Sequence, residues 1–135
     1  MSLNLTTKEI IALGSLFGVG SKRIYAIAET PGEDLLRRIS ACGFLLKENG
    51  KEVTVSSTHL ERAFGFAESI LRQCEKWGVK ALRYDDEAYP EMLRHTVDEK
   101  GEPTPPLLLY ALGDFSALSA PCVAIVGTRN PTKEG

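Results

Sequence analysis

The sequence predicts an α+β chain of two parts: a helical domain over residues 1–78 and the beginning of an α/β domain over residues 79–135. The first observation is that apolar residues recur every three or four positions up to Trp77, as in amphipathic helices. The second is that short apolar runs of strand length follow Gly78. The third is that the last run is apolar on both faces, which is typical of a strand buried in a parallel sheet.

Start and stop signals predict three helices before residue 43. Thr6 and Glu9 form a capping box that begins the first helix, and a Gly-Val-Gly turn ends it. Ser21 can cap the second helix, which ends at a Thr-Pro-Gly sequence. A third helix is expected over residues 33–42, with a glycine directly after it.

The fourth helix, from about residue 58 to Trp77, is the clearest element. Thr58 and Glu61 form a second capping box, and Gly78 is the natural residue to follow the last turn. A continuous apolar stripe follows the helix and consists of Leu60, Ala63, Phe64, Ala67, Ile70, Leu71, Cys74 and Trp77. Before this helix, Asn49-Gly50 signals a turn, and residues 53–55 could form a short strand.

Three strands are expected after residue 78, over residues 79–84, 107–112 and 122–126. The last strand is a tight apolar run that ends at a glycine. Because both of its faces are apolar, it needs strands beside it and helices above and below it. We therefore expect the start of a doubly wound, Rossmann-like parallel sheet, in which ligands bind at the carboxyl ends of the strands.

Composition and cysteine usage exclude several classes of protein. A net charge of −2 weakly opposes general nucleic-acid binding but leaves room for a local basic site. Cys42, Cys74 and Cys122 are odd in number and widely spaced, so reduced thiols are expected rather than disulfides or a zinc site. His59 and His95 lack ligand partners at metal-binding spacing. Without a signal peptide or membrane helix, a cytoplasmic protein with no membrane association is expected.

The turn between the first two helices has the pattern of a helix-hairpin-helix. Gly18 and Gly20 allow a tight turn, and the N–H groups that begin the second helix can hold a DNA phosphate. Lys22 and Arg23 stand where they could add positive charge. Binding of this kind carries no sequence specificity, since a phosphate holds no base information. The alternative is a compact turn that serves only the helical bundle.

A second candidate site follows the last predicted strand. Gly127, Thr128, Arg129 and Thr132 form a loop of glycine, hydroxyl and arginine residues. Loop N–H groups and threonine hydroxyls can hold a phosphate, and the guanidinium of Arg129 can donate two parallel hydrogen bonds to it. The alternative is an ordinary strand-to-helix turn with a solvated arginine. The loop matches neither a dinucleotide-binding nor a Walker motif.

Three sequence elements, in order along the chain, resemble the DprA/Smf family of DNA-processing proteins. The elements are Tyr89-Pro90-Glu91-Met92-Leu93, like the family's Y-P-x-x-L; Pro105-Pro106-Leu107-Leu108-Leu109-Tyr110 with Gly113, like P-P-x-x-L-[FY]-x-x-G; and Ala124-Ile125-Val126-Gly127-Thr128-Arg129 with Thr132, like A-I-V-G-S/T-R-x-x-S/T. The resemblance covers about residues 79–135, and the helical front is similar, less specifically, to the family's SAM-like or helix-hairpin-helix domain. One departure is Glu134, where the family has tyrosine.

The resemblance implies a protein that binds single-stranded DNA and helps to load a RecA-type recombinase in natural transformation and recombination. It implies a homodimer of the intact protein, and neither catalysis nor a cofactor. The sequence agrees, since it shows no catalytic triad or metal cluster, and the acids at 85–87 are expected in a solvated turn. Two alternatives remain: a nucleotide or phospho-sugar enzyme of the lysine-decarboxylase-like Rossmann group, and a protein-interaction module.

The two ends of the chain suggest a fragment. Residues 1–3 and 134–135 are typical of residues left by cloning, and the carboxyl end interrupts the third family element. A Rossmann-like domain that began at residue 79 would then be truncated. We expect strand 122–126 to lack most of its neighbours in that case, which favours pairing between chains at its open edges.

Overall fold

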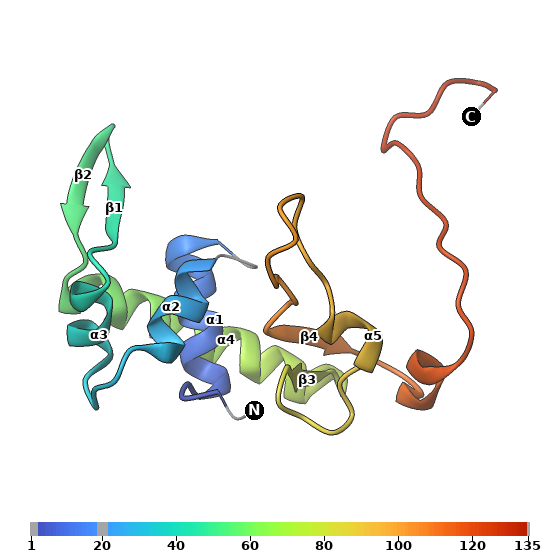
Figure 1. The fold of residues 1–135 in the computed structure, drawn as a ribbon, viewed down its shortest axis with the longest axis horizontal. Helices are drawn as coiled ribbons and strands as arrows, with labels where there is room; N and C mark the ends of the chain where they lie inside the picture. The colour runs from blue at the N-terminus through green and yellow to red at the C-terminus, as the bar shows by residue number, and fades with distance from the viewer. Residues whose placement is uncertain (1–2, 19–21, 135) are drawn as a thin grey trace.

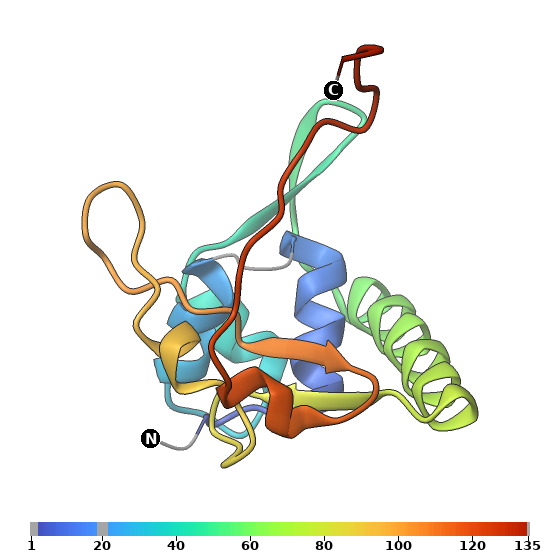
Figure 2. The ribbon, with the colours of Figure 1, turned by 90° about the vertical axis from the view of Figure 1, so that its right-hand side faces the viewer.

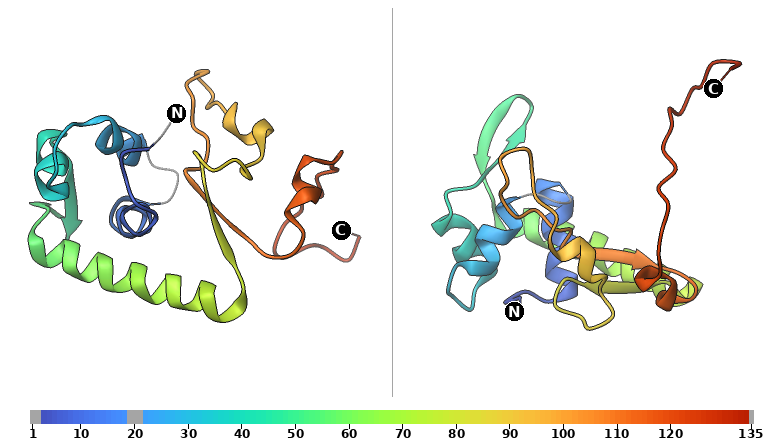
Figure 3. Two further views of the ribbon diagram at one scale, coloured as in Figure 1. Left: turned by 90° about the horizontal axis from the view of Figure 1, so that it is seen from below. Right: turned by 45° about the vertical axis from the view of Figure 1, so that its right-hand side comes forward.

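Two helices packed face to face form the base of the fold in the computed structural model, which describes residues 3–18 and 22–134. They are α1 (Thr7–Phe17) and the long α4 (Ser57–Trp77). The side chains that meet between them include Ala12 of α1 and Ala67 of α4, both fully buried. Small side chains at these positions let the two helices approach closely, and Figure 3 shows α4 extending well past α1.

Two shorter helices complete the main core: α2 (Lys22–Glu29) and α3 (Leu35–Ala41). The apolar face of α2 buries Ile24 and Ile27 against Leu13 of α1 and Ile39 of α3. The predicted capping box of Thr6 and Glu9 begins α1, which confirms that expectation. Ser21 lies outside the described residues, so its expected role as a cap stays a prediction.

A buried arginine fastens α2 to α3 and to the amino-terminal segment. The side chain of Arg38, whose residue is only 4% exposed, donates hydrogen bonds to the carbonyls of Asn4, Ile27 and Thr30, the Nη2–Ile27 O distance being 2.7 Å. Ile27 lies in the last turn of α2, where carbonyls lack partners within the helix and a cation is favourable. Gly32 gives this side chain room, because an added Cβ there would lie 3.2 Å from Arg38 Cγ.

A hairpin between α3 and α4 projects from the helical body (Figure 1). Its strands are β1 (Leu45–Glu48) and β2 (Lys51–Thr54), joined by the predicted Asn49-Gly50 turn. Positive φ angles of 52° at Asn49 and 78° at Gly50 are those required by a tight two-residue hairpin. The strand expected over residues 53–55 is β2, which begins two residues earlier and ends one residue earlier than expected.

The long helix begins one residue earlier than expected, and the capping prediction was wrong. Ser56 is the N-cap, and its side chain accepts from the backbone N–H of His59 while Nδ1 of His59 accepts from the backbone N–H of Ser56. Thr58 and Glu61 therefore lie inside the helix. A serine is as good a cap as a threonine, so the sequence offered two possible starts close together. The end at Gly78, in the left-handed conformation, is confirmed.

Residues after Gly78 form a second, antiparallel hairpin. Strand β3 (Lys80–Arg83) pairs with β4 (Leu108–Ala111), with Leu82 opposite Leu109. Two strands were expected here, but the expectation of a parallel sheet was wrong for the described residues. The hairpin joins the helical core, because Leu107 is buried with the residues of α1 and α2. The division of the chain at residue 78 remains a prediction.

The long connection between β3 and β4 is held by a tyrosine hydroxyl. Tyr89, 3% exposed, donates to the carbonyl of Pro106 at 2.7 Å. The guanidinium of Arg94, in the short helix α5 (Glu91–Arg94), lies over the rings of Tyr84 and Tyr89, 5.5 and 5.1 Å from their centroids. The Tyr-Pro and Pro-Pro sequence elements, 16 positions apart in sequence, therefore meet through one hydrogen bond.

The predicted strand over residues 122–126 is wrong for this structure. After a short 3₁₀ helix, η1 (Phe115–Ser119), the chain is extended but forms no strand among the described residues. Val123, Ile125 and Val126 are each at least 90% exposed. Since β3 and β4 pair with each other, neither a neighbouring parallel strand nor a covering helix is present to bury this segment. Figure 2 shows it leading away from the body.

Replacing Arg38 with methionine should lower the free energy of unfolding by ~3 kcal/mol, because the carbonyls of Asn4, Ile27 and Thr30 would lose the buried guanidinium that donates to them. Urea denaturation measures this loss. The matched control is Arg37→Met on the same helix, where the side chain is 89% exposed and the change should be small. Equal losses in the two variants would contradict the assigned role of Arg38.

Tyr89→Phe should lower the free energy of unfolding by ~1–2 kcal/mol, because the ring stays while the hydrogen bond to Pro106 is lost. Tyr110→Phe is the control, since Tyr110 is half-exposed. Thermal denaturation of both variants is the measurement. A Tyr89→Phe protein as stable as the unaltered chain would show that the hydroxyl does not hold the connection.

Candidate nucleic-acid interface

The first candidate site lies where α1 ends and α2 begins. Gly18 is the residue after α1 and has a φ of 89°, a backbone conformation that other residues rarely adopt. An added Cβ at this glycine would meet no neighbouring atom within 4 Å, so the position is open. Gly20 lies outside the described residues. Gly18, the one glycine of this turn within the described residues, therefore has the positive φ that the motif predicts.

The two basic residues of this turn are engaged within the molecule. Lys22 Nζ lies 2.7 Å from Asp98 Oδ2 and also pairs with Glu102. The hydrogen bonds to these two carboxylates raise the pKa of Lys22 above its ordinary value. Arg23 places its guanidinium over the rings of Phe17 and Phe44, at 5.6 and 5.7 Å from their centroids. Neither contact was visible in the sequence, because most of the partners lie on distant segments.

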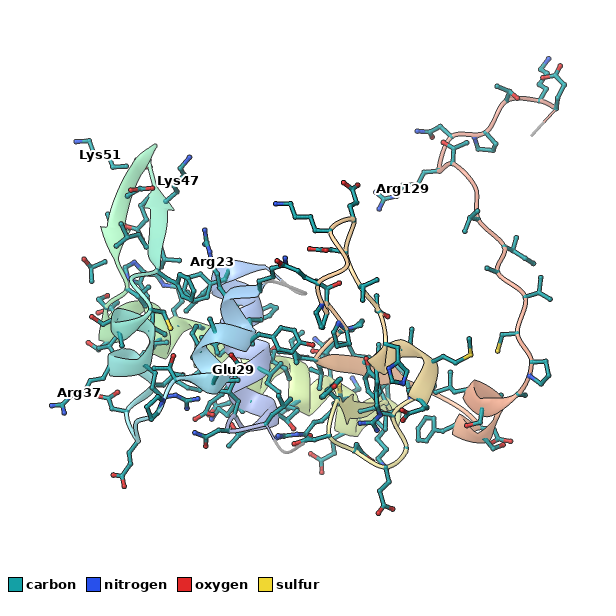
Figure 4. All side chains as sticks on the ribbon, in the orientation of Figure 1. Arg23, Glu29, Arg37, Lys47, Lys51 and Arg129 are labelled. Atoms are coloured by element: carbon teal, nitrogen blue, oxygen red, sulfur yellow. The ribbon has the colours of Figure 1, made fainter. Side chains whose placement is uncertain are left out.

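The second candidate site lies in the exposed segment after η1. Gly127, Thr128, Arg129 and Thr132 are all exposed, and Figure 4 shows the Arg129 side chain projecting from this segment. The hydroxyl of Thr128 accepts from the backbone N–H of Asn130 at 3.3 Å, a local turn contact. The expected strand-loop-helix context is not formed, since residues 131–134 adopt no helix. The candidate phosphate-binding residues of this loop therefore lie outside any helix or strand.

The structure does not join the two candidate sites into one. Arg23 and Arg129 belong to separate parts of the molecule, the first on the helical body and the second on the extended segment (Figure 4). Lys47 and Lys51, at the tip of the β1–β2 hairpin, are a further pair of cations that no sequence motif marks. Each has an acid opposite it in the ladder, Glu52 for Lys47 and Glu48 for Lys51. The hairpin tip is therefore close to neutral overall.

Charges near the end of β3 serve the fold. The carboxylate of Asp85 accepts from Arg83 at 2.8 Å and from the backbone N–H of Leu3 at 2.9 Å. The hydrogen bond from Arg83 is the main cause that lowers the pKa of Asp85 to about 2. The acids at 85–87 thus lie in a turn, as expected, but Asp85 is not simply solvated. Its carboxylate joins the end of β3 to the amino-terminal segment.

Metal-binding and membrane-spanning features are absent from the described part of the chain. Within residues 3–18 and 22–134, no group of three histidine, cysteine or acidic side chains is placed to hold a metal ion. In the same part of the chain, no helix has the length and apolar character needed to cross a membrane. The three cysteines are all free thiols in the structure.

Comparison with known protein families gives a match to the carboxyl-terminal part of the chain. Residues 80–135 match the family model of DNA recombination-mediator protein A. No curated protein matches the chain, and no solved structure matches it. The matched segment begins at the first residue of β3 and contains the Tyr-Pro and Pro-Pro elements as well as the loop with Arg129. Residues 80–135 are therefore similar to the DNA recombination-mediator protein A family, the resemblance that the three sequence elements predicted.

Proposed function

We propose that this chain acts in DNA recombination as a mediator that binds single-stranded DNA and has no catalytic role of its own. The observation that carries the proposal is the family match over residues 80–135, a segment that ends in the glycine, threonine and arginine loop. A phosphate-binding loop of this composition suits a DNA backbone, whose contacts position the strand without reading its sequence. The family also suggests a RecA-type recombinase as the partner that receives the DNA, a cytoplasmic location, and a homodimer of the intact protein.

Arg129 is the proposed principal contact within this loop. Its guanidinium is exposed and charged at every physiological pH, so it can donate charge-assisted hydrogen bonds to a phosphate. The hydroxyls of Thr128 and Thr132 and the N–H group of Gly127 would complete the contact. Because the segment is extended in the free chain, the entropy lost in ordering it would offset part of the binding free energy.

The helix-hairpin-helix turn is a proposed second, weaker contact. Gly18 adopts the open conformation that lets a backbone approach closely, and Lys22 and Arg23 lie at the start of α2. Gly20 belongs to the proposed contact on sequence grounds alone. Binding here would depend strongly on salt, since it rests on charge and not on base recognition.

A second candidate function, protein interaction, is favoured by the exposed apolar side chains of the carboxyl-terminal half. Met92 and Leu112 are 88% and 71% exposed, in addition to the three residues of segment 122–126. Val123, Ile125 and Val126 follow one another along one exposed segment, and such a run of apolar side chains is available to a protein partner. This role is compatible with DNA binding, since a mediator must contact a recombinase as well as DNA.

Arg129→Ala should weaken the binding of single-stranded DNA by ~1–3 kcal/mol, because one charge-assisted contact is lost. It should also make the dependence of log K on log[salt] shallower, by the slope that about one phosphate contact contributes. Fluorescence anisotropy of a labelled oligo-dT at several salt concentrations measures both quantities. Arg37→Ala, which removes an exposed arginine from α3, is the control and should change neither. Unchanged affinity of the Arg129→Ala protein at low salt would defeat the proposal.

A further inference from the structure

An acidic hairpin, which we define as residues 96–104, lies beside the start of α2. The backbone N–H of Thr104 donates to the carbonyl of Thr96 at 2.8 Å, and Val97 and Pro103 form a β-bridge. At the tip, the N–H of Asp98 donates to Glu102 O and the N–H of Gly101 donates to Asp98 O, both at 2.9 Å. The hairpin is therefore a closed turn of defined shape and not an irregular loop.

The tip of this hairpin aims two carboxylates at one lysine. Asp98 Oδ1 accepts from the backbone N–H groups of Lys100 and Glu102, at 2.8 and 3.0 Å, which fixes the orientation of the carboxylate. Its other oxygen, Oδ2, lies 2.7 Å from Lys22 Nζ, and Glu102 pairs with the same ammonium. The hydrogen bond from Lys22 is the largest cause that lowers the pKa of Asp98. The Asp98 carboxylate is therefore ionised at neutral pH.

A second contact fixes the hairpin against the same helix. The hydroxyl of Tyr25 donates to the carbonyl of Pro105 at 2.5 Å, directly after the hairpin. Lys22 and Tyr25 are three residues apart in α2, so they lie on one face of that helix. The hairpin thus covers the face of α2 that carries Lys22, and Figure 1 shows it as the orange loop that rises beside the helical body.

We propose that the acidic hairpin competes with DNA phosphates for Lys22 and so keeps the helix-hairpin-helix turn a weak DNA binder. Carboxylate and phosphate oxygens are both anionic acceptors for an ammonium group. Two carboxylates already lie at this Nζ, so a phosphate that approaches it is repelled by two negative charges and competes with them for the ammonium group. The side chain of Lys22 is 53% exposed and that of Glu102 is 61% exposed. An ion pair so open to water contributes little stability, which makes its displacement by a polyanion feasible.

This inference rests on the proposed function, because it presumes that the turn meets DNA. It adds a regulatory element that the DNA-binding motif itself does not contain. Because a DNA contact at Lys22 must first break these ion pairs, the free energy needed to break them weakens DNA binding at this turn. Neutralising the two carboxylates should therefore release Lys22 and add about one phosphate contact to DNA binding.

The test compares two variants with the same change in net charge. Asp98→Asn with Glu102→Gln removes both charged partners of Lys22, while the side-chain amide oxygen introduced at position 98 can still accept the backbone hydrogen bonds that hold the turn. Glu87→Gln with Glu99→Gln neutralises two other exposed acids and is the control. Binding of labelled oligo-dT to the full chain is measured by fluorescence anisotropy at several salt concentrations. Each variant is also made in the Arg129→Ala background, which removes the other proposed contact.

The released variant, Asp98→Asn with Glu102→Gln, should bind about five- to tenfold more tightly than the unaltered chain at low salt, with a salt slope steeper by ~0.7, the value for one phosphate of a single strand. The control should gain no more than about twofold, the general effect of two fewer negative charges. The gain should persist in the Arg129→Ala background and vanish when Lys22→Ala is added.

Equal gains in the released variant and the control would overturn the inference while leaving DNA binding in place. A released variant that loses stability without gaining affinity would show that the hairpin only fastens the fold, which also overturns it. If neither the unaltered chain nor any variant bound oligo-dT at low salt, the proposed function would fail, and the inference would fail with it.

Discussion

The guanidinium of Arg38 lies where α2, α3 and the amino-terminal segment meet, and the arrangement of the helical body depends on it. It supplies donors to carbonyls that the last turn of α2 cannot satisfy by itself, and it reaches Asn4 as well. A buried charge is costly unless such partners surround it, so the contact tolerates little variation. Because α2 is a short, regular helix, fixing its end also fixes the direction of its axis and so the position of its first residue, Lys22. Lys22 then lies within reach of the acidic hairpin.

Local signals allowed the secondary structure to be predicted over much of the chain. Thr6 with Glu9, Asn49-Gly50 and Gly78 each mark a boundary through interactions within a few residues, and each boundary is where the sequence placed it. The antiparallel pairing of β3 with β4 depends on residues more than twenty positions apart. Apolar patterning indicates that a strand is present but does not select its partner. The apolar run at 122–126 was assigned to a sheet for the same reason, although no strand is available to pair with it among the described residues.

The candidate site was only partly predictable, and the reason is again distance along the chain. The residues that could bind phosphate were identified from glycine and hydroxyl patterns next to basic side chains. The availability of Lys22 in the folded chain depends on Asp98 and Glu102, which are 76 and 80 residues away in sequence and contact it only after folding. For the Tyr-Pro and Pro-Pro elements, the residues themselves were predictable and only the contact between them was not. Both were recognised in the sequence, and the structure adds that the hydroxyl of Tyr89 joins them.

Hydrogen exchange of the full chain, with and without oligo-dT, tests the central claim that residues 127–132 form the DNA contact. In the free chain the amides of this exposed segment should exchange fast, since backbone partners are scarce there, while those of β3 and β4 should exchange slowly. Adding oligo-dT should slow exchange in the segment and leave β3 and β4 unchanged. Binding of oligo-dT with no change in exchange over residues 127–132 would contradict the account, because the DNA would then be held elsewhere.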